Sequence, residues 1–99
     1  MRSRVMVDRA IVDALMPDLV GHDHHPSAFL VYLYLWCRAP RRRERRATVS
    51  LQQIAIETGL SKSAAQQALR RLKRRRLVTS RRPSATSIPD YVVHSPWSR

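Results

Sequence analysis

A run of polar and basic residues from position 61 to 75 carries side chains suited to binding another molecule. If this run is helical, with about 100° per residue, one side presents hydroxyl, amide and guanidinium groups from Ser63, Gln66, Gln67, Arg70 and Arg74. Such groups hydrogen-bond base edges and phosphates. A helix that only covers a core also has a wet side, usually with mixed charges, but no acid occurs from position 61 to 82. The pattern favours a helix that binds a polyanion.

The residues before this run predict a shorter helix and a turn that position it. Ser50 is a good N-cap, and Gln53 can reach back to its backbone N–H in a capping box. Gly59 stands where the chain must turn with positive φ, which glycine adopts without strain, and Ser61 can cap the next helix. Two apolar sides are expected to face the core: Leu51, Ile54 and Ala55, then Ala65, Ala68, Leu69 and Leu72.

The small and apolar residues of this stretch have the relative spacing of a helix-turn-helix: Ala55, Gly59, Leu60, Ala65 and Ala68. With the run LRRLKRRRLV entering a predicted strand, residues 26–94 resemble bacterial winged helix-turn-helix proteins. These include the DNA-binding modules of GntR-type and MarR-type repressors and the winged helices of replication initiators. The resemblance implies a mainly α fold with a small β-wing, meaning a three-helix core and a β-hairpin, here with an extra N-terminal helix. GntR-type wings usually have glycines at the tip, whereas this tip reads RPSATS.

The resemblance also implies which side chains meet double-stranded DNA. Matched position by position, they are Ser61, Lys62, Ser63, Gln66, Gln67 and Arg70, with Arg81 and Arg82 in the wing. By their chemistry, Gln66 and Gln67 suit adenine edges and Arg70 suits guanine. Phosphate contacts are expected mainly from Lys62, Arg71, Arg74, Arg75, Arg81 and Arg82, which predicts steep salt dependence. In a homodimer, two such helices read successive major grooves about 34 Å apart.

The composition predicts a folded protein with a polyanionic partner. The 99 residues suffice for one domain with a modest core, and 43 % of them are hydrophobic. Lys and Arg number 19 against 7 Asp and Glu, a formal net charge of +12. The first part, up to Cys37, has a net charge of −1, and the rest has +13. We expect an N-terminal extension with a His-rich linker at 1–25 and a winged helix-turn-helix domain at 26–99.

The sequence lacks the marks of a membrane or secreted protein. No apolar run is long enough for a membrane span, and the first residues lack the continuous apolar segment of a signal peptide. Cys37 is the single cysteine, which excludes an internal disulfide and fits a reducing cytosol. As a small hydrophobe it is expected to be buried. We expect a cytoplasmic protein, on the nucleoid if it binds DNA.

Further elements are predicted on both sides of the helix pair. Residues 3–7 alternate weakly like a strand, and Asp8 can cap a helix that Pro17 discourages from continuing. Residues 28–37 are apolar nearly all round, which predicts a buried central helix whose surplus a partner helix, such as a second copy, would cover. Short strands are expected at 48–49, 77–80 and 90–94, with a projecting turn-rich loop at 81–89 and Trp97 packed on the core.

The cluster with metal-ligand residue types is His22, Asp23, His24 and His25. Zinc or nickel would accept such ligands, but adjacent residues of one loop cannot all point at one ion, and only His94 or Cys37 could supply more. We expect no bound metal or other cofactor, and a polar linker here. The basic run Arg41–Arg46 is either a solvated connector or an arm that grips phosphates.

Several functions fit these features to different degrees. The first is a sequence-specific DNA-binding regulator of transcription, and the second is a plasmid or phage replication initiator or partition protein with the same contacts. A non-specific DNA or RNA binder and a protein-interaction adaptor are the remaining binding functions. An enzyme is not expected, because the chain has no Gly-rich phosphate loop and no nucleophile with an evident base, and Glu57 and Asp90 are its only acids after Glu44.

Overall fold

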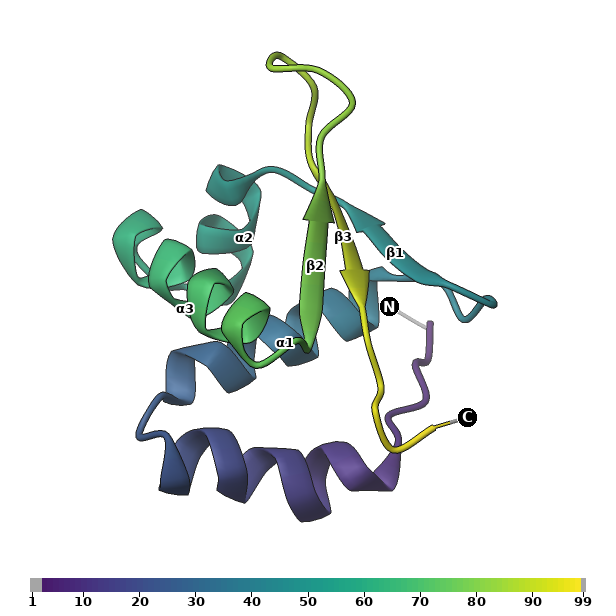
Figure 1. Cartoon of the computed structure of the whole chain (residues 1–99), viewed down its shortest axis with the longest axis vertical. Coiled ribbons are helices and arrows are strands. Elements are labelled where there is room, and N and C mark those ends of the chain that lie inside the picture. Colours follow the sequence, from purple (N-terminus) through teal and green to yellow (C-terminus); the bar gives the residue numbers. More distant parts are fainter. Residues whose placement is uncertain (1–2, 99) are drawn as a thin grey trace.

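The computed structural model describes residues 3–98, in which helices pack against a small antiparallel sheet (Figure 1). In chain order the elements are the π-helices η1 (Ile11–Leu15) and η2 (Pro17–His22), then α1 (Pro26–Arg38), β1 (Arg45–Thr48), α2 (Leu51–Thr58), α3 (Lys62–Arg74), β2 (Val78–Arg81) and β3 (Asp90–Val93). The chain is thus a mixed α/β domain with the predicted helices and β-hairpin. Within the described range, no helix has the length and apolar character needed to cross a membrane.

The helix pair α2 and α3 forms as its end residues predict. The Ser50 hydroxyl accepts from the Gln53 N–H at 3.1 Å, Gly59 turns the chain with φ 79°, and the Ser61 hydroxyl accepts from the Ala64 N–H at 3.0 Å. One detail of the prediction is wrong. The Gln53 side chain donates to the carboxylate of Glu57 at 3.2 Å instead of closing a capping box at Ser50. The Glu57 carboxylate, one helical turn further along α2, thus binds the Gln53 side chain in place of the Ser50 backbone N–H.

The sheet has strand order β1-β3-β2, and both neighbouring pairs are antiparallel. Tyr91 in the central strand pairs with Ala47 of β1 and with Ser80 of β2. The loop between β2 and β3 projects away from the body of the molecule (Figure 1). The first strand was predicted only at 48–49, but β1 begins inside the basic run at Arg45, because its backbone completes the sheet along the free edge of β3.

The N-terminal helix continues past Pro17, contrary to the prediction that this proline discourages its continuation. The chain stays helical from Arg9 to His22. The N–H groups of Met16 and Asp23 donate to carbonyls five residues back, which is π-helical bonding. This wider turn relieves the clash between a proline ring and the carbonyl four residues earlier. The predicted His-rich loop is shorter in consequence, because His22 belongs to η2 and the His25 ring caps α1.

The central helix α1 is buried along most of its surface, as predicted. Tyr32 and Leu35 are 0 % exposed and Trp36 is 1 % exposed. The N-terminal helix packs on α1 and covers much of its apolar surplus within the same chain. The prediction that Cys37 is buried is wrong, since this residue is exposed. It lies seven residues after Leu30, which is 46 % exposed, so both fall on the outward side of α1.

The two ends of the described chain meet beside α1. The Trp36 indole N–H donates to the carbonyl of Met6 at 2.9 Å, and the Trp97 indole N–H donates to the carboxylate of Asp8 at 3.0 Å. The prediction that Trp97 packs on the core is confirmed, because its ring lies 6.3 Å from that of Trp36. The predicted strand at residues 3–7 is wrong, since this exposed segment has no regular secondary structure.

Candidate nucleic-acid interface

The exposed side of α3 carries most of the polar residues singled out in the sequence. The helix turns its apolar stripe inward, where Ala65, Ala68 and Leu72 are 0 % exposed. The opposite side is open to solvent and, with the residues at the helix start, consists of Ser61, Lys62, Ser63, Gln66, Gln67, Arg70 and Arg74. We call these seven residues the α3 face. Helical spacing assigns these hydrogen-bonding groups to one side of α3, a helix that lies at the edge of the molecule (Figure 1).

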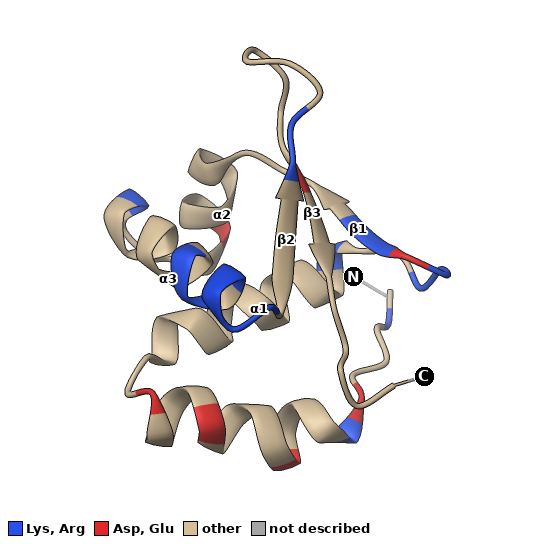
Figure 2. Ribbon diagram, in the orientation of Figure 1, with Lys and Arg blue, Asp and Glu red and all other residues tan. Residues whose placement is uncertain are grey.

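The basic side chains of the α3 face have no carboxylate partner among the residues that the structure describes. This holds for Lys62, Arg70 and Arg74, and also for the half-buried Arg71 beside them. Figure 2 shows basic residues gathered on the second half of α3, whereas most acids of the first fifty residues lie on or beside the N-terminal helix. The guanidinium and ammonium donors of Lys62, Arg70 and Arg74 are therefore free to bind an anion.

The nearest acid on the neighbouring helix is already engaged elsewhere. Glu57 of α2 accepts a hydrogen bond from the Tyr34 hydroxyl at 2.6 Å and lies 3.7 Å from the guanidinium of Arg38. The hydrogen bonds from Tyr34 and from the Gln53 amide lower the pKa of Glu57. Burial and the hydrogen bond to Glu57 raise the pKa of Tyr34 to about 12. This carboxylate ties α2 to α1 and does not neutralise the α3 face.

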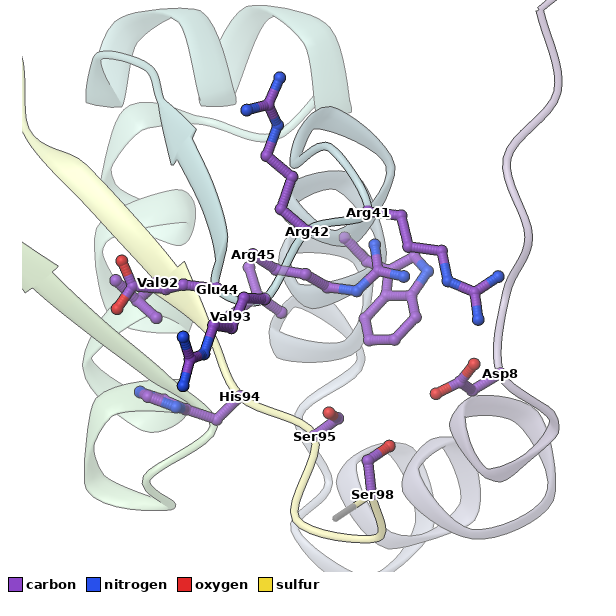
Figure 3. Close-up of a pocket in the computed structure, with 12 residues that line it drawn as sticks. Asp8, Arg41, Arg42, Glu44, Arg45, Val92, Val93, His94, Ser95 and Ser98 are labelled. Carbon is purple, nitrogen blue, oxygen red and sulfur yellow. The ribbon is translucent and has the colours of Figure 1, made fainter.

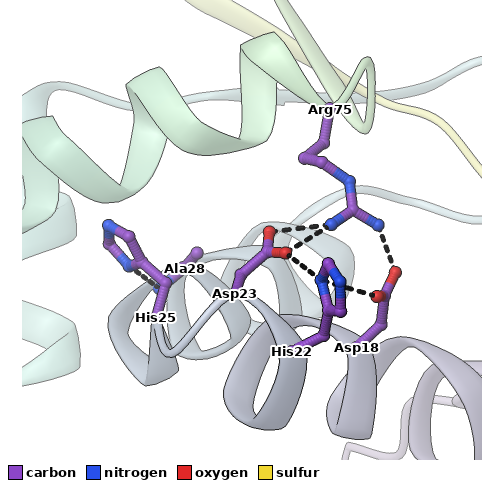
Figure 4. A network of polar contacts seen from close by, with 6 residues as sticks. All are labelled: Asp18, His22, Asp23, His25, Ala28 and Arg75. Carbon is purple, nitrogen blue, oxygen red and sulfur yellow. Dashed lines mark hydrogen bonds and ion pairs between the residues drawn. The ribbon is translucent and has the colours of Figure 1, made fainter.

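Arg75, which was expected to contact phosphate, lies elsewhere. Figure 4 shows its guanidinium between two carboxylates of the N-terminal helix. It donates to both oxygens of Asp23 at 2.7 and 2.8 Å, and it also pairs with Asp18. The side chain of Asp23 is only 5 % exposed. The two nitrogens of one guanidinium thus bridge two carboxylates, Nη1 to Asp23 and Nη2 to Asp18, which fixes the end of α3 to the N-terminal helix. Arg75 therefore does not join the α3 face.

The same cluster includes two of the residues with metal-ligand types that were noted in the sequence, His22 and Asp23. Ligand atoms of Asp18, His22 and Asp23 lie within 4.8 Å of one another. The cation between the carboxylates is the guanidinium of Arg75, whose pKa they raise, Asp18 most of all. The other two histidines do not join them: the His25 ring accepts from the Ala28 N–H at 3.3 Å, and His24 is an exposed residue with φ 53°. The arrangement is a structural ion-pair network.

The two arginines expected in the wing lie at the base of the projecting loop. Arg81 ends β2, is 66 % exposed and has Glu44 at 4.0 Å. Arg82 follows it and donates to the Ala85 carbonyl within the loop at 3.3 Å, with no carboxylate partner among the described residues. Both are therefore accessible at the base of the loop, and Arg82 carries the less compensated charge.

Lys73 is a further basic residue on this side that the sequence analysis did not select. It is exposed, and it follows Gln66 by seven residues and Arg70 by three. That spacing alone assigns it to the same side of the helix, so helical periodicity could have identified it. Among the described residues, the exposed side of α3 and Arg71 have no carboxylate partner, whereas Arg81 has Glu44 at 4.0 Å and pairs across the sheet with Asp90.

Comparison with known proteins adds no relative to this picture: no protein-family model, no curated protein and no solved structure matches the chain.

Proposed function

We propose that this protein is a winged helix-turn-helix DNA-binding protein that reads duplex DNA by placing α3 in the major groove. The observation that carries the proposal is the α3 face, because its amides and unpaired basic groups are exposed together on one helix. The antiparallel β2–β3 pair with its projecting loop corresponds to a wing beside that helix.

The side chains of the α3 face and the arginines near it are proposed to make two kinds of contact, with bases and with phosphates. Gln66 and Gln67 offer a donor and an acceptor each, which suits bidentate contacts with adenine, and Arg70 offers the fork that suits guanine. Lys62, Arg71 and Arg74 flank them and suit phosphates, which fix the helix in register but carry no sequence information. Arg81 and Arg82 extend the phosphate contacts to the wing.

We infer that the protein regulates transcription as a homodimer. A single α3 reads only a few base pairs, and two copies related by a two-fold axis read an inverted repeat with half-sites about 34 Å apart. Each good bidentate contact contributes about 1–3 kcal/mol of discrimination against the wrong base. A dimer doubles the number of such contacts and so increases the preference for its site over random duplex.

Selection of bound duplexes from a random pool tests the proposal. The expected result is an enriched inverted repeat, bound with a logarithmic salt slope of about −4 or steeper, since each neutralised phosphate contributes about −0.9. A matched control is Arg9→Gln, which removes an arginine that is 91 % exposed on the N-terminal helix and leaves affinity unchanged. Equal affinity for random duplex and for RNA would reject sequence-specific reading, and the absence of any duplex binding would reject the proposal.

A further inference from the structure

A cleft of about 690 Å³ opens at the edge of the sheet opposite α3. Its walls are the basic run that precedes β1, the segment after β3, and the start of the N-terminal helix (Figure 3). In the strand order β1-β3-β2, the cleft lies at β1 and α3 packs beside β2. The two basic surfaces are therefore on different sides of the molecule, and a duplex on the α3 face does not cover this cleft.

Four arginines line the cleft, and two of them have their donors directed along it. The guanidinium of Arg45 stacks on the indole of Trp36, 3.7 Å from the ring centroid. Face-on stacking leaves the N–H groups in the guanidinium plane free to donate. Figure 3 shows Arg41 extending beside Arg45, with the hydroxyls of Ser95 and Ser98 on the opposite wall, while Arg42 extends away from them. Guanidinium and hydroxyl donors thus face each other across the cleft.

The two carboxylates in the lining are already bound to other groups. Asp8 accepts from the Trp97 indole at 3.0 Å. Glu44 pairs with Arg46, which lies outside the lining, and has Arg81 at 4.0 Å. Arg41 donates to no carboxylate among the described residues, and its guanidinium meets only the sulfur of Met6 at 3.6 Å. The lining therefore has an excess of positive charge together with free donors.

We propose that this cleft binds a small anion with two or more phosphate groups, such as a diphosphate or triphosphate. Its volume falls within the range of about 300–1,000 Å³ typical of small-ligand sites. Guanidinium forks match phosphate oxygens in bidentate geometry, and the serine hydroxyls supply further donors. Because the cleft is concave and separate from α3, it suits a small ligand better than the backbone of a duplex. The proposal does not depend on DNA binding by the α3 face.

Titration of the full chain with inorganic triphosphate tests this site. The two tryptophans of the sequence report on it, because Trp36 lines the cleft under Arg45 and Trp97 holds Asp8. We expect a saturable change in tryptophan fluorescence and matching heat in calorimetry, with no response to sodium chloride at equal ionic strength. A nucleoside triphosphate is titrated in parallel. Tighter binding of the nucleotide assigns the site to nucleotides, and equal binding assigns it to the phosphate chain alone.

Two variants connect the signal to the cleft. Arg41→Gln removes an exposed cation, and Arg45→Lys keeps the charge but loses the fork and its stacking. Each is expected to weaken triphosphate binding by about tenfold or more, since one charge-assisted hydrogen bond is worth at least that factor. Arg9→Gln is the matched control with unchanged binding. Circular dichroism establishes that each variant is folded.

Three results overturn the proposal. The first is unchanged triphosphate affinity in both cleft variants. The second is an equal loss of affinity in Arg9→Gln, which would indicate general charge attraction. The third is a loss of duplex affinity in Arg41→Gln and Arg45→Lys together with displacement of triphosphate by duplex, which would assign the cleft to DNA. Failure of DNA binding by the α3 face, with triphosphate binding retained, rejects only the proposed function.

Discussion

Arg74 and Arg75 are neighbours in the sequence but belong to two regions of opposite character. Arg74 lies with Arg70 on the α3 face, where no carboxylate of the described chain pairs with them. Arg75 crosses to the N-terminal helix and binds Asp18 and Asp23 (Figure 4). Net charge is therefore a poor guide to a binding surface. The informative quantity is the charge that the fold leaves without a partner.

The largest expected effect is at the α3 face. The double variant Gln67→Ala/Arg70→Ala removes an amide and a guanidinium proposed to contact bases, each worth about 1–3 kcal/mol. We expect affinity for the selected duplex to fall by about hundredfold or more, measured by gel shift at one fixed salt concentration. Thermal unfolding should change little, because both side chains are exposed. Affinity equal to that of the unchanged protein would remove the α3 face from the account.

Substitution of Arg75 is expected to lower the stability of the fold and not the affinity for DNA. Arg75→Ala leaves the nearly buried carboxylate of Asp23 without its cation, and we expect the free energy of unfolding to fall by about 2 kcal/mol. The loss stays below that of a fully buried pair because the Arg75 side chain is 31 % exposed. Urea titration measures the effect. Arg75→Lys keeps the charge but has no second nitrogen to bridge Asp18 and Asp23, so its loss of stability should be smaller than that of Arg75→Ala. A large loss of duplex affinity with unchanged stability would reverse the assigned roles.

A smaller effect is expected at the base of the wing. Arg82→Gln removes a cation with no carboxylate partner among the described residues, so the slope of log affinity against log salt should become less steep by about 0.9. Arg46→Gln is the matched comparison, because Arg46 already pairs with Glu44 and lies 3.9 Å from Asp90. Removal of the Arg46 charge should change the salt slope less than removal of the Arg82 charge does. Equal slopes for the two variants would show that pairing does not decide which arginines meet DNA.

The smallest predicted effect concerns acid. Hydrogen bonding from His22 and pairing with Arg75 hold the pKa of Asp23 below its ordinary value of 3.8, although burial opposes them. A carboxyl whose pKa is lower in the folded state stabilises the fold above pH 3.8, and this stabilisation is lost as the pH falls through that value and below. Asp23→Asn should therefore lose less stability than the unchanged protein between pH 5 and pH 2, as measured by urea unfolding at each pH. Parallel curves would exclude this contribution.

Local features of the fold could be predicted because they depend on residues close in sequence. The caps at Ser50 and Ser61, the left-handed turn at Gly59 and the buried stripe of α3 each follow from side chains within one or two helical turns. The exposed side of α3 follows from the same periodicity. This is why most of the candidate site was predictable from its composition and spacing.

The role of Arg75 could not be predicted, because its partners Asp18 and Asp23 are more than fifty residues away in the sequence. The cleft has the same origin, since it is assembled from the N-terminal segment, the run before β1 and the chain after β3. For Cys37 the sequence gives only part of the answer: its spacing of seven from Leu30 assigns both residues to one side of α1. Only knowledge of which side faces the solvent was lacking.

The wide turns around Pro17 have a consequence for the contact that Arg75 makes. In a regular α-helix, positions 18 and 23 would project about 140° apart around the axis, too far round for one guanidinium to touch both. Five-residue hydrogen bonding reduces that angle and brings the two carboxylates to the same side. The backbone ladder of the first helix thus sets the spacing of the acidic pair that anchors the end of α3.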